Sequence, residues 1–254
     1  MHRDGPAMVL AGPGAGKTYV ITNRVKVLID EYGVKPEQIL VVTFSKAAAV
    51  EMKERFEMLT GGRRLPVRFG TFHSVFFQIL RLAYHYEVKD IATPALKYRF
   101  LEETLNETGY GVDDKKEFLS DIEKEISRVK GEIDCYFSSA CSAESFQKMY
   151  RGYQEKLQRH RCLDFDDMVV YTYQLLKERE DIRRRWQAQF RYLLIDEFQD
   201  INRLQYETVC MLAEPENNLF IVGDDDQSIY GFRGAKPGIM LSFPKRFPDT
   251  KQIV

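Results

Sequence analysis

The sequence contains few cysteines and histidines, and they are not arranged as a metal site. Four cysteines and four histidines occur among 254 residues. The cysteines have no C-x-x-C spacing, and the histidines form no ligand pattern with them. We therefore expect reduced, structural thiols, which fits a cytoplasmic protein.

The sequence also lacks a long apolar run, a signal peptide and a strong charge of either sign. No apolar stretch approaches the length that spans a bilayer, and no secretory leader opens the chain. We therefore expect no membrane association. Lys and Arg number 37 against 38 Asp and Glu, a net charge of −1. The overall charge thus gives no indication of a nucleic-acid partner.

The charge is distributed unevenly along the chain. Residues 84–182 hold 15 Lys and Arg and 21 Asp and Glu, a balance of −6, whereas the remainder holds 22 and 17, a balance of +5. This asymmetry favours a polyanionic partner for the remainder. Hydrophobic residues make up 44% and charged residues 30%, enough to bury a core in one large or two modest domains.

Short apolar runs alternate with helical patterns in both end portions of the chain. Continuous β-branched and aromatic runs are typical of strands buried on both faces of a parallel sheet. Strands are expected at residues 8–10, 39–44, 67–69, 192–196, 219–224 and from 252 onward. Helices are expected at residues 19–25, 47–59, 75–84 and 203–213, with a turn at 70–74. This order predicts a doubly wound α/β lobe.

The central part of the chain has a different character. Apolar residues recur there at helical spacing among many charges, as at Phe118, Ile122, Ile126 and Val129, and no strong strand run appears. We interpret it as an inserted all-helical subdomain. The expected division is 1–84 for the first part of the α/β lobe, 85–182 for the insertion and 183–254 for the second part.

A glycine-rich loop joins the first expected strand to the first expected helix. A phosphate-binding loop requires this order of strand, glycine-rich loop and helix. Its backbone N–H groups surround an anion at the N-terminus of the helix. Lys17 would contact the β- and γ-phosphates, and Thr18 would hold Mg²⁺. The bland alternative is a glycine-rich turn before a surface lysine. The residues predicted to bind nucleotide are Gly12, Gly14, Ala15, Gly16, Lys17 and Thr18.

Two adjacent acids follow the apolar run at residues 192–195. In this position Asp196 would order Mg²⁺, and Glu197 would polarise the attacking water. The alternative is a solvated acidic turn. The pairing with the loop at Lys17 favours the functional interpretation.

Residues 223–234 are dense in acids, amides, glycines and aromatics. Gln227 could hydrogen-bond a γ-phosphate. Tyr230, Phe232 and Arg233 could contact bases and backbone of a nucleic acid, because bases stack on aromatic faces and guanidinium binds phosphate. Without further context, a tight turn that packs both aromatics into the core is the preferred interpretation of this stretch.

Six blocks together resemble the UvrD/Rep/PcrA-type superfamily 1 DNA helicases, in the order in which that family carries them. The blocks are A-G-P-G-A-G-K-T at 11–18, V-T-F-S at 42–45 with E-M at 51–52, G-T-F-H-S at 70–74, L-D-F-D-D-M at 163–168, D-E-F-Q-D at 196–200, and V-G-D-D-D-Q-S-I-Y-G-F-R-G-A at 222–235. The last of these blocks is the most specific.

The resemblance implies a RecA-like P-loop NTPase lobe that uses ATP and Mg²⁺. It further implies 3′ to 5′ translocation on single-stranded DNA and at single-strand/duplex junctions, in DNA repair or replication. Nucleotide and metal roles then fall on Lys17, Thr18, Asp196, Glu197 and Gln227, of which Lys17, Glu197 and Gln227 are catalytic. DNA contacts fall on Phe44, Thr71, His73, Tyr230, Phe232 and Arg233, although a histidine such as His73 is more often a capping or core residue.

The family's second motor lobe has no counterpart in these 254 residues, so the sequence is expected to be the first half of a motor. Such a half is expected to be nearly inactive as an ATPase without that partner lobe. Two other interpretations stay open. One is a non-motor module that binds single-stranded DNA and keeps a vestigial nucleotide site. The other is a P-loop enzyme of different chemistry, such as a small-molecule kinase.

Overall fold

The computed structural model describes residues 2–12, 14–132, 141–224 and 237–253, which form two compact units. Met1–Val75 and Tyr173–Val254 make the sheet unit, and Phe76–Thr172 make the helical unit. Both junctions fall inside helices, α3 (Phe72–Tyr84) and α7 (Phe165–Glu178). The three-part division at residues 84 and 182 stays a prediction, with its boundaries further along the chain than these junctions.

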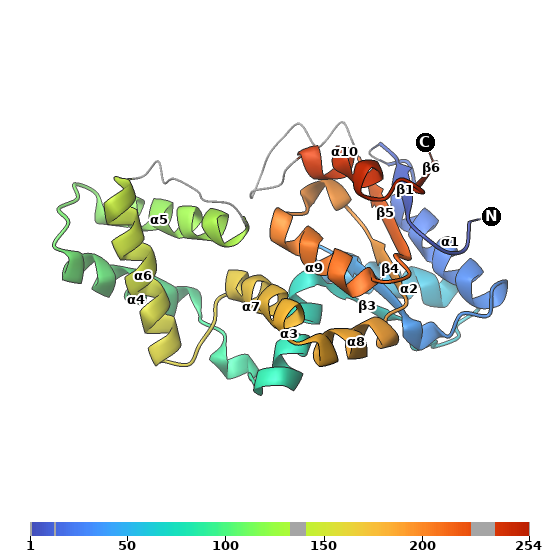
Figure 1. The fold of residues 1–254 in the computed structure, drawn as a ribbon, viewed down its shortest axis with the longest axis horizontal. Helices are drawn as coiled ribbons and strands as arrows, with labels where there is room; N and C mark the ends of the chain where they lie inside the picture. Colours follow the sequence, from blue (N-terminus) through green and yellow to red (C-terminus); the bar gives the residue numbers. More distant parts are fainter. Residues whose placement is uncertain (1, 13, 133–140, 225–236, 254) are drawn as a thin grey trace. The chain divides into compact units, whose positions relative to one another are not determined.

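Six strands of the described chain form one parallel sheet in the order β3-β2-β4-β5-β1-β6 (Figure 1). This confirms the predicted parallel α/β lobe. The prediction of a turn at residues 70–74 is wrong, because β3 continues to Thr71 and α3 begins at the next residue. The strands are β1 (Ala7–Leu10), β2 (Ile39–Thr43), β3 (Arg68–Thr71), β4 (Tyr192–Ile195), β5 (Leu219–Gly223) and β6 (Lys251–Ile253).

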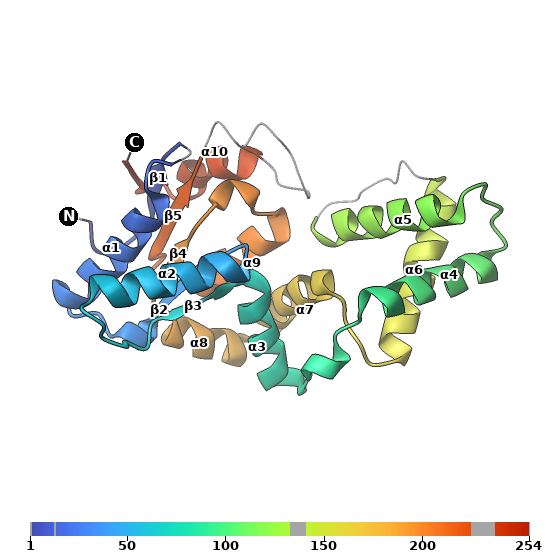
Figure 2. The ribbon, with the colours of Figure 1, turned by 180° about the vertical axis from the view of Figure 1, so that it is seen from behind.

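Helices cover both faces of the sheet, so its central strands are buried throughout. In Figures 1 and 2, α1 (Lys17–Asp30) and α2 (Lys46–Leu59) lie on one face, and α9 (Arg203–Ala213) and α10 (Pro237–Arg246) lie on the other. α8 (Glu180–Gln189) precedes β4. Every residue of β2, β4 and β5 is buried, which explains their continuous apolar runs.

Alternate residues of each strand face opposite helical layers. The layer under α1 and α2 shares one core that includes Val9, Val41, Leu194, Val222 and Phe56. All strands are parallel, so their carboxyl ends lie at one edge of the sheet. The loops after β1, β2, β3, β4 and β5 therefore begin at that edge, which is where open α/β sheets bind ligands.

The helical unit has its own apolar core, as the sequence pattern predicts. Ile122 and Ile126 are buried in it, whereas Phe118 and Val129 pack partly buried against it. No strand of the described chain lies in this unit. Its α-helices are the second part of α3, α4 (Pro94–Thr108), α5 (Lys115–Lys130), α6 (Ala143–Arg159) and the first part of α7.

A buried ion network lies at the start of α7. The Nζ atom of Lys130 is 2.6 Å from Asp164 Oδ2 and 2.8 Å from Asp167 Oδ1, and the lysine side chain is 0% exposed. The Tyr153 hydroxyl also donates to Asp164. Burial opposes the charge on Lys130, but the two carboxylates outweigh it and hold the pKa of the ammonium above its ordinary value.

A third carboxyl, Asp166, lies near this network and accepts a hydrogen bond from Ser127. Burial and the charge of Asp164 raise its pKa to about 6, against the opposing effects of Ser127 and Lys130. The folded protein therefore retains a proton on Asp166 that the unfolded chain releases at lower pH. Its contribution to stability is present below about pH 4 and is lost as pH rises toward 6.

Asp166→Asn should consequently stabilise the helical unit by about 1–3 kcal/mol at pH 8, and by much less at pH 4. Chemical unfolding followed by circular dichroism at both pH values measures the difference. Asp113→Asn, at an exposed position of the same unit, is the control and should change little. An equal effect of Asp166→Asn at both pH values would contradict the raised pKa.

Candidate functional site

Residues far apart in the sequence meet at the carboxyl edge of the sheet. β5 lies between β1 and β4, so the loops after Leu10, Ile195 and Gly223 are neighbours. The backbone N–H of Ala11 donates to the Gly223 carbonyl at 3.0 Å, and that of Asp196 donates to the Val42 carbonyl at 3.0 Å. The phosphate loop predicted at 11–18 and the predicted acidic pair therefore share one site within the sheet unit.

The glycine loop has the backbone conformation that its residue types allow. Gly14 and Gly16 have φ values of 73° and 81°, a left-handed region that side chains rarely adopt. A Cβ atom at Gly12 or Gly14 would meet nothing within 4 Å, so there is open space beside both glycines. The N–H of Ala15 donates to the Gly12 carbonyl at 3.2 Å, so this donor is engaged within the loop itself.

Lys17 and Glu197 form an ion pair across the site. Nζ of Lys17 lies 2.8 Å from Oε2 of Glu197, and the lysine side chain is only 10% exposed. Glu197 has φ 49° and ψ 45°, a left-handed conformation that costs free energy in a non-glycine residue. Such strain is held where the surrounding structure imposes it, here in the turn between β4 and the short helix η3 (Phe198–Asp200).

Asp196 is buried directly beside this pair. Among the described residues, no hydrogen-bond partner is found for its Oδ1 atom. Burial, and then the charge of Glu197, raise the pKa of Asp196 to about 6, against smaller opposing effects of a hydrogen bond from the Glu197 backbone and then of the Lys17 charge. A buried carboxylate oxygen without a partner fits a site for a cation or its water shell.

The side chains around Asp196 also fit Mg²⁺ better than a metal that several protein side chains hold. No group of three or more His, Cys, Asp or Glu that could hold a metal occurs in the described part of the chain. Mg²⁺ keeps several waters and is usually bound through one or two carboxylates and the phosphates of a substrate. Thr18, in the first turn of α1, and Asp196 are the residues that could hold it with a nucleotide.

Three residues predicted to contact DNA lie at the ends of β2 and β3, away from the phosphate loop at β1. Phe44 follows β2, and its ring centroid is 5.0 Å from that of Phe72. Thr71 ends β3, and its Oγ1 accepts a hydrogen bond from the Ser74 backbone. His73 lies in the first turn of α3, where burial lowers its pKa and so favours the neutral imidazole.

Gln227, Tyr230, Phe232 and Arg233 lie outside the described residues. The structure therefore brings Lys17, Asp196 and Glu197 together. It places Phe44, Thr71 and His73 elsewhere, near the ends of β2 and β3.

Gln199 also lies in this site and was not predicted from the sequence. Its amide bonds both Glu197 and the backbone of Asp224. Gln199 lies inside the block D-E-F-Q-D at 196–200, and its place in this block could have indicated a site residue. Its second partner follows a different strand, which the local pattern does not indicate.

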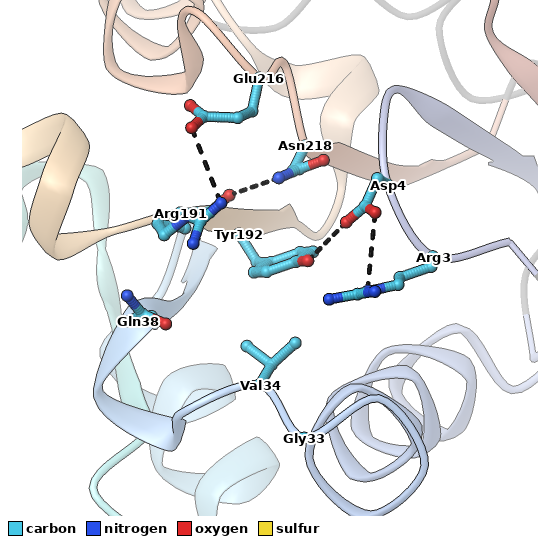
Figure 3. A pocket seen from close by; sticks show the side chains of 9 residues that line it. All are labelled: Arg3, Asp4, Gly33, Val34, Gln38, Arg191, Tyr192, Glu216 and Asn218. Carbon is cyan, nitrogen blue, oxygen red and sulfur yellow. Dashed lines mark hydrogen bonds and ion pairs between the residues drawn. The ribbon is translucent and has the colours of Figure 1, made fainter.

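A separate cavity of about 360 Å³ opens at the opposite, amino edge of the sheet (Figure 3). Its charged groups are paired with one another: Arg3 with Asp4, and Arg191 with Glu216. The Tyr192 hydroxyl also donates to Asp4 at 2.5 Å. These polar groups satisfy each other, so the cavity does not require a ligand.

Comparison with known proteins agrees with this geometry. Residues 1–248 match the model of the UvrD/REP helicase N-terminal domain. The chain belongs to this family. Its sheet unit is therefore a RecA-like P-loop lobe, as the motif blocks predict.

Two relatives show how much of such a protein the chain covers. The ATP-dependent DNA helicase PcrA of Staphylococcus aureus is 35% identical over an alignment of 262 positions, which covers 98% of this chain and 35% of PcrA. The protein YjcD of Bacillus subtilis is 39% identical over 265 residues, which span 98% of this chain and 34% of YjcD. The chain thus spans about a third of the length of these family members.

The described part of this UvrD/REP family chain holds no helix suited to crossing a membrane. None of the helices there combines the length and the apolar character that crossing a bilayer requires.

Proposed function

We propose that this chain is the ATP-binding lobe of an ATP-dependent DNA helicase that translocates 3′ to 5′ on single-stranded DNA. The observation that supports this most is the pairing of Lys17 with Glu197, which joins the phosphate loop to the acidic turn. Membership of the UvrD/REP family and the helicase name of the Staphylococcus aureus relative agree with it.

In this proposal, the nucleotide lies against residues 11–18 at the N-terminus of α1. Lys17 exchanges Glu197 for the β- and γ-phosphates, and Thr18 and Asp196 hold Mg²⁺, which neutralises phosphate charge during transfer. Glu197, released from Lys17, orients the attacking water and accepts its proton. Gln227 contacts the γ-phosphate.

DNA binding is assigned to three residues near the ends of β2 and β3 and to three residues further along the chain than β5. Phe44, Thr71 and His73, with Tyr230, Phe232 and Arg233, contact single-stranded DNA and its junction with duplex in repair or replication. The neutral form of His73 fits a hydrogen bond to a base or sugar better than an ion pair with phosphate. A second motor lobe completes the hydrolytic site, so this chain alone hydrolyses ATP weakly. We place the activity in the cytoplasm.

Lys17→Ala tests the nucleotide site in the 254-residue chain. Losing a charged hydrogen-bond donor to phosphate should weaken ATP and ADP binding by about 10–150-fold, since such bonds contribute about 1.5–3 kcal/mol. Titration calorimetry with Mg·ATP measures the change. Lys26→Ala, on the same helix and paired with Asp30, is the matched control. Unchanged affinity in a folded Lys17→Ala protein would refute the assignment of this loop.

A further inference from the structure

Gln199 links two strands of the candidate site through both ends of its amide. Its Nε2 donates to Glu197 Oε2 at 2.6 Å, and its Oε1 accepts the backbone N–H of Asp224 at 3.0 Å. The residue is 3% exposed. A carboxylate needs a donor and a backbone N–H needs an acceptor, so these two partners fix the orientation of the amide.

The same carboxylate oxygen of Glu197 is held by two groups at once. Lys17 lies 2.8 Å from Oε2, on the side of the phosphate loop. Gln199 approaches the same atom from η3. When phosphate takes Lys17, as the proposed function requires, the hydrogen bond from Gln199 is the side-chain contact described here that still orients Glu197.

The end of β5 is shaped to admit this glutamine. A Cβ atom at Gly223 would lie 2.9 Å from Gln199 Oε1 and 2.8 Å from Met240 Cε, closer than real Cβ contacts. Gly223 also accepts the N–H of Ala11 through its carbonyl. Contacts therefore run in a closed ring from the phosphate loop through Gly223, Asp224, Gln199 and Glu197 back to Lys17.

We propose that Gln199 is a positioning residue that holds the Glu197 carboxylate once phosphate has displaced it from Lys17, and that reports this exchange to the Asp224 backbone. The inference rests on the proposed nucleotide function. Removal of the ammonium from Glu197 leaves more negative charge facing the Gln199 amide. Because hydrogen bonds in a chain polarise one another, the bond from the Asp224 N–H to Oε1 strengthens.

The test is the amide proton resonance of Asp224 in the 254-residue chain, recorded with and without the non-hydrolysable probe Mg·AMP-PNP. In the wild type we expect a downfield shift on binding, and the same direction of shift in nucleotide-free Lys17→Met. Gln199→Met keeps the length of the side chain but makes neither hydrogen bond. In this background the shift on binding Mg·AMP-PNP and the shift caused by adding Lys17→Met should both vanish. Exchange of the Asp224 amide should become about 2–10-fold faster, as expected for one lost hydrogen bond.

Gln205→Met is the matched control. Gln205 is also a buried glutamine, but its side chain caps α9 by accepting the Asn202 N–H. A merely structural loss of a buried glutamine should leave the Asp224 response intact there. Should Gln199→Met fail to fold, Gln199→Leu, which also lacks both hydrogen bonds, is the second variant. It should likewise make the Asp224 amide exchange about 2–10-fold faster and abolish its response.

The outcomes separate the two proposals. A chain that does not bind AMP-PNP overturns the nucleotide site, while the nucleotide-free Lys17→Met comparison still tests the ring of contacts. Binding with the same Asp224 response in Gln199→Met as in the wild type overturns the role of Gln199. A wild type that binds the probe without any Asp224 response overturns it as well.

Discussion

Glu197→Gln is expected to slow ATP hydrolysis by about 10²–10⁴-fold, the range that a positioned general base contributes. The amide keeps the shape of the side chain but cannot take a proton from water. It also removes the negative charge that pairs with Lys17, so phosphate no longer competes with a carboxylate for that ammonium. ATP binding should therefore stay as tight as in the wild type or become tighter.

The measurement requires both motor lobes and compares steady-state hydrolysis with equilibrium binding of ATP. Asp196→Asn should behave differently, losing the response to Mg²⁺ together with turnover. Glu216→Gln is the control, because Glu216 pairs with Arg191 at the opposite edge of the sheet. Near-normal hydrolysis in Glu197→Gln would assign proton transfer to another group.

Lys130→Met should destabilise the helical unit by about 3–5 kcal/mol at neutral pH, because it leaves the buried carboxylates of Asp164 and Asp167 without their cation. The variant that also carries Asp164→Asn and Asp167→Asn should recover most of this loss. Asn at position 164 can still accept the Asp167 N–H, which caps α7 at 2.8 Å. Removing only the cation of this network should therefore cost stability, whereas removing all three charges should cost little.

Two probes separate the units in this experiment. The single tryptophan, Trp186, is buried in the sheet unit, so its fluorescence follows that unit, while circular dichroism follows both. In Lys130→Met the dichroism transition should move to lower denaturant and the fluorescence transition should not. Lys124→Met, at an exposed position of α5, should change neither. A fully normal dichroism transition in Lys130→Met would show that the network contributes little to stability.

Local sequence patterns predicted the α/β fold because they are properties of neighbouring residues. The apolar runs at β2, β4 and β5 indicate strands buried on both faces, and the structure confirms them. The boundary between β3 and α3 was wrong because Thr71 and Ser74 bond each other's backbone N–H groups and allow the helix to begin at Phe72. Side-chain capping of this kind outweighs the turn tendency of Gly70.

The sequence by itself determined the chemistry of the site, and the tertiary structure decided which groups meet. Glycines at 14 and 16 permit the left-handed backbone, and an acid follows β4, as local pattern predicted. The pairing of Lys17 with Glu197, 180 positions apart, depends on β5 lying between β1 and β4. Strand order is set by packing of the whole sheet against its helices, and no local run of residues specifies it. For the same reason only the fold revealed that Gln199 joins Glu197 to Asp224.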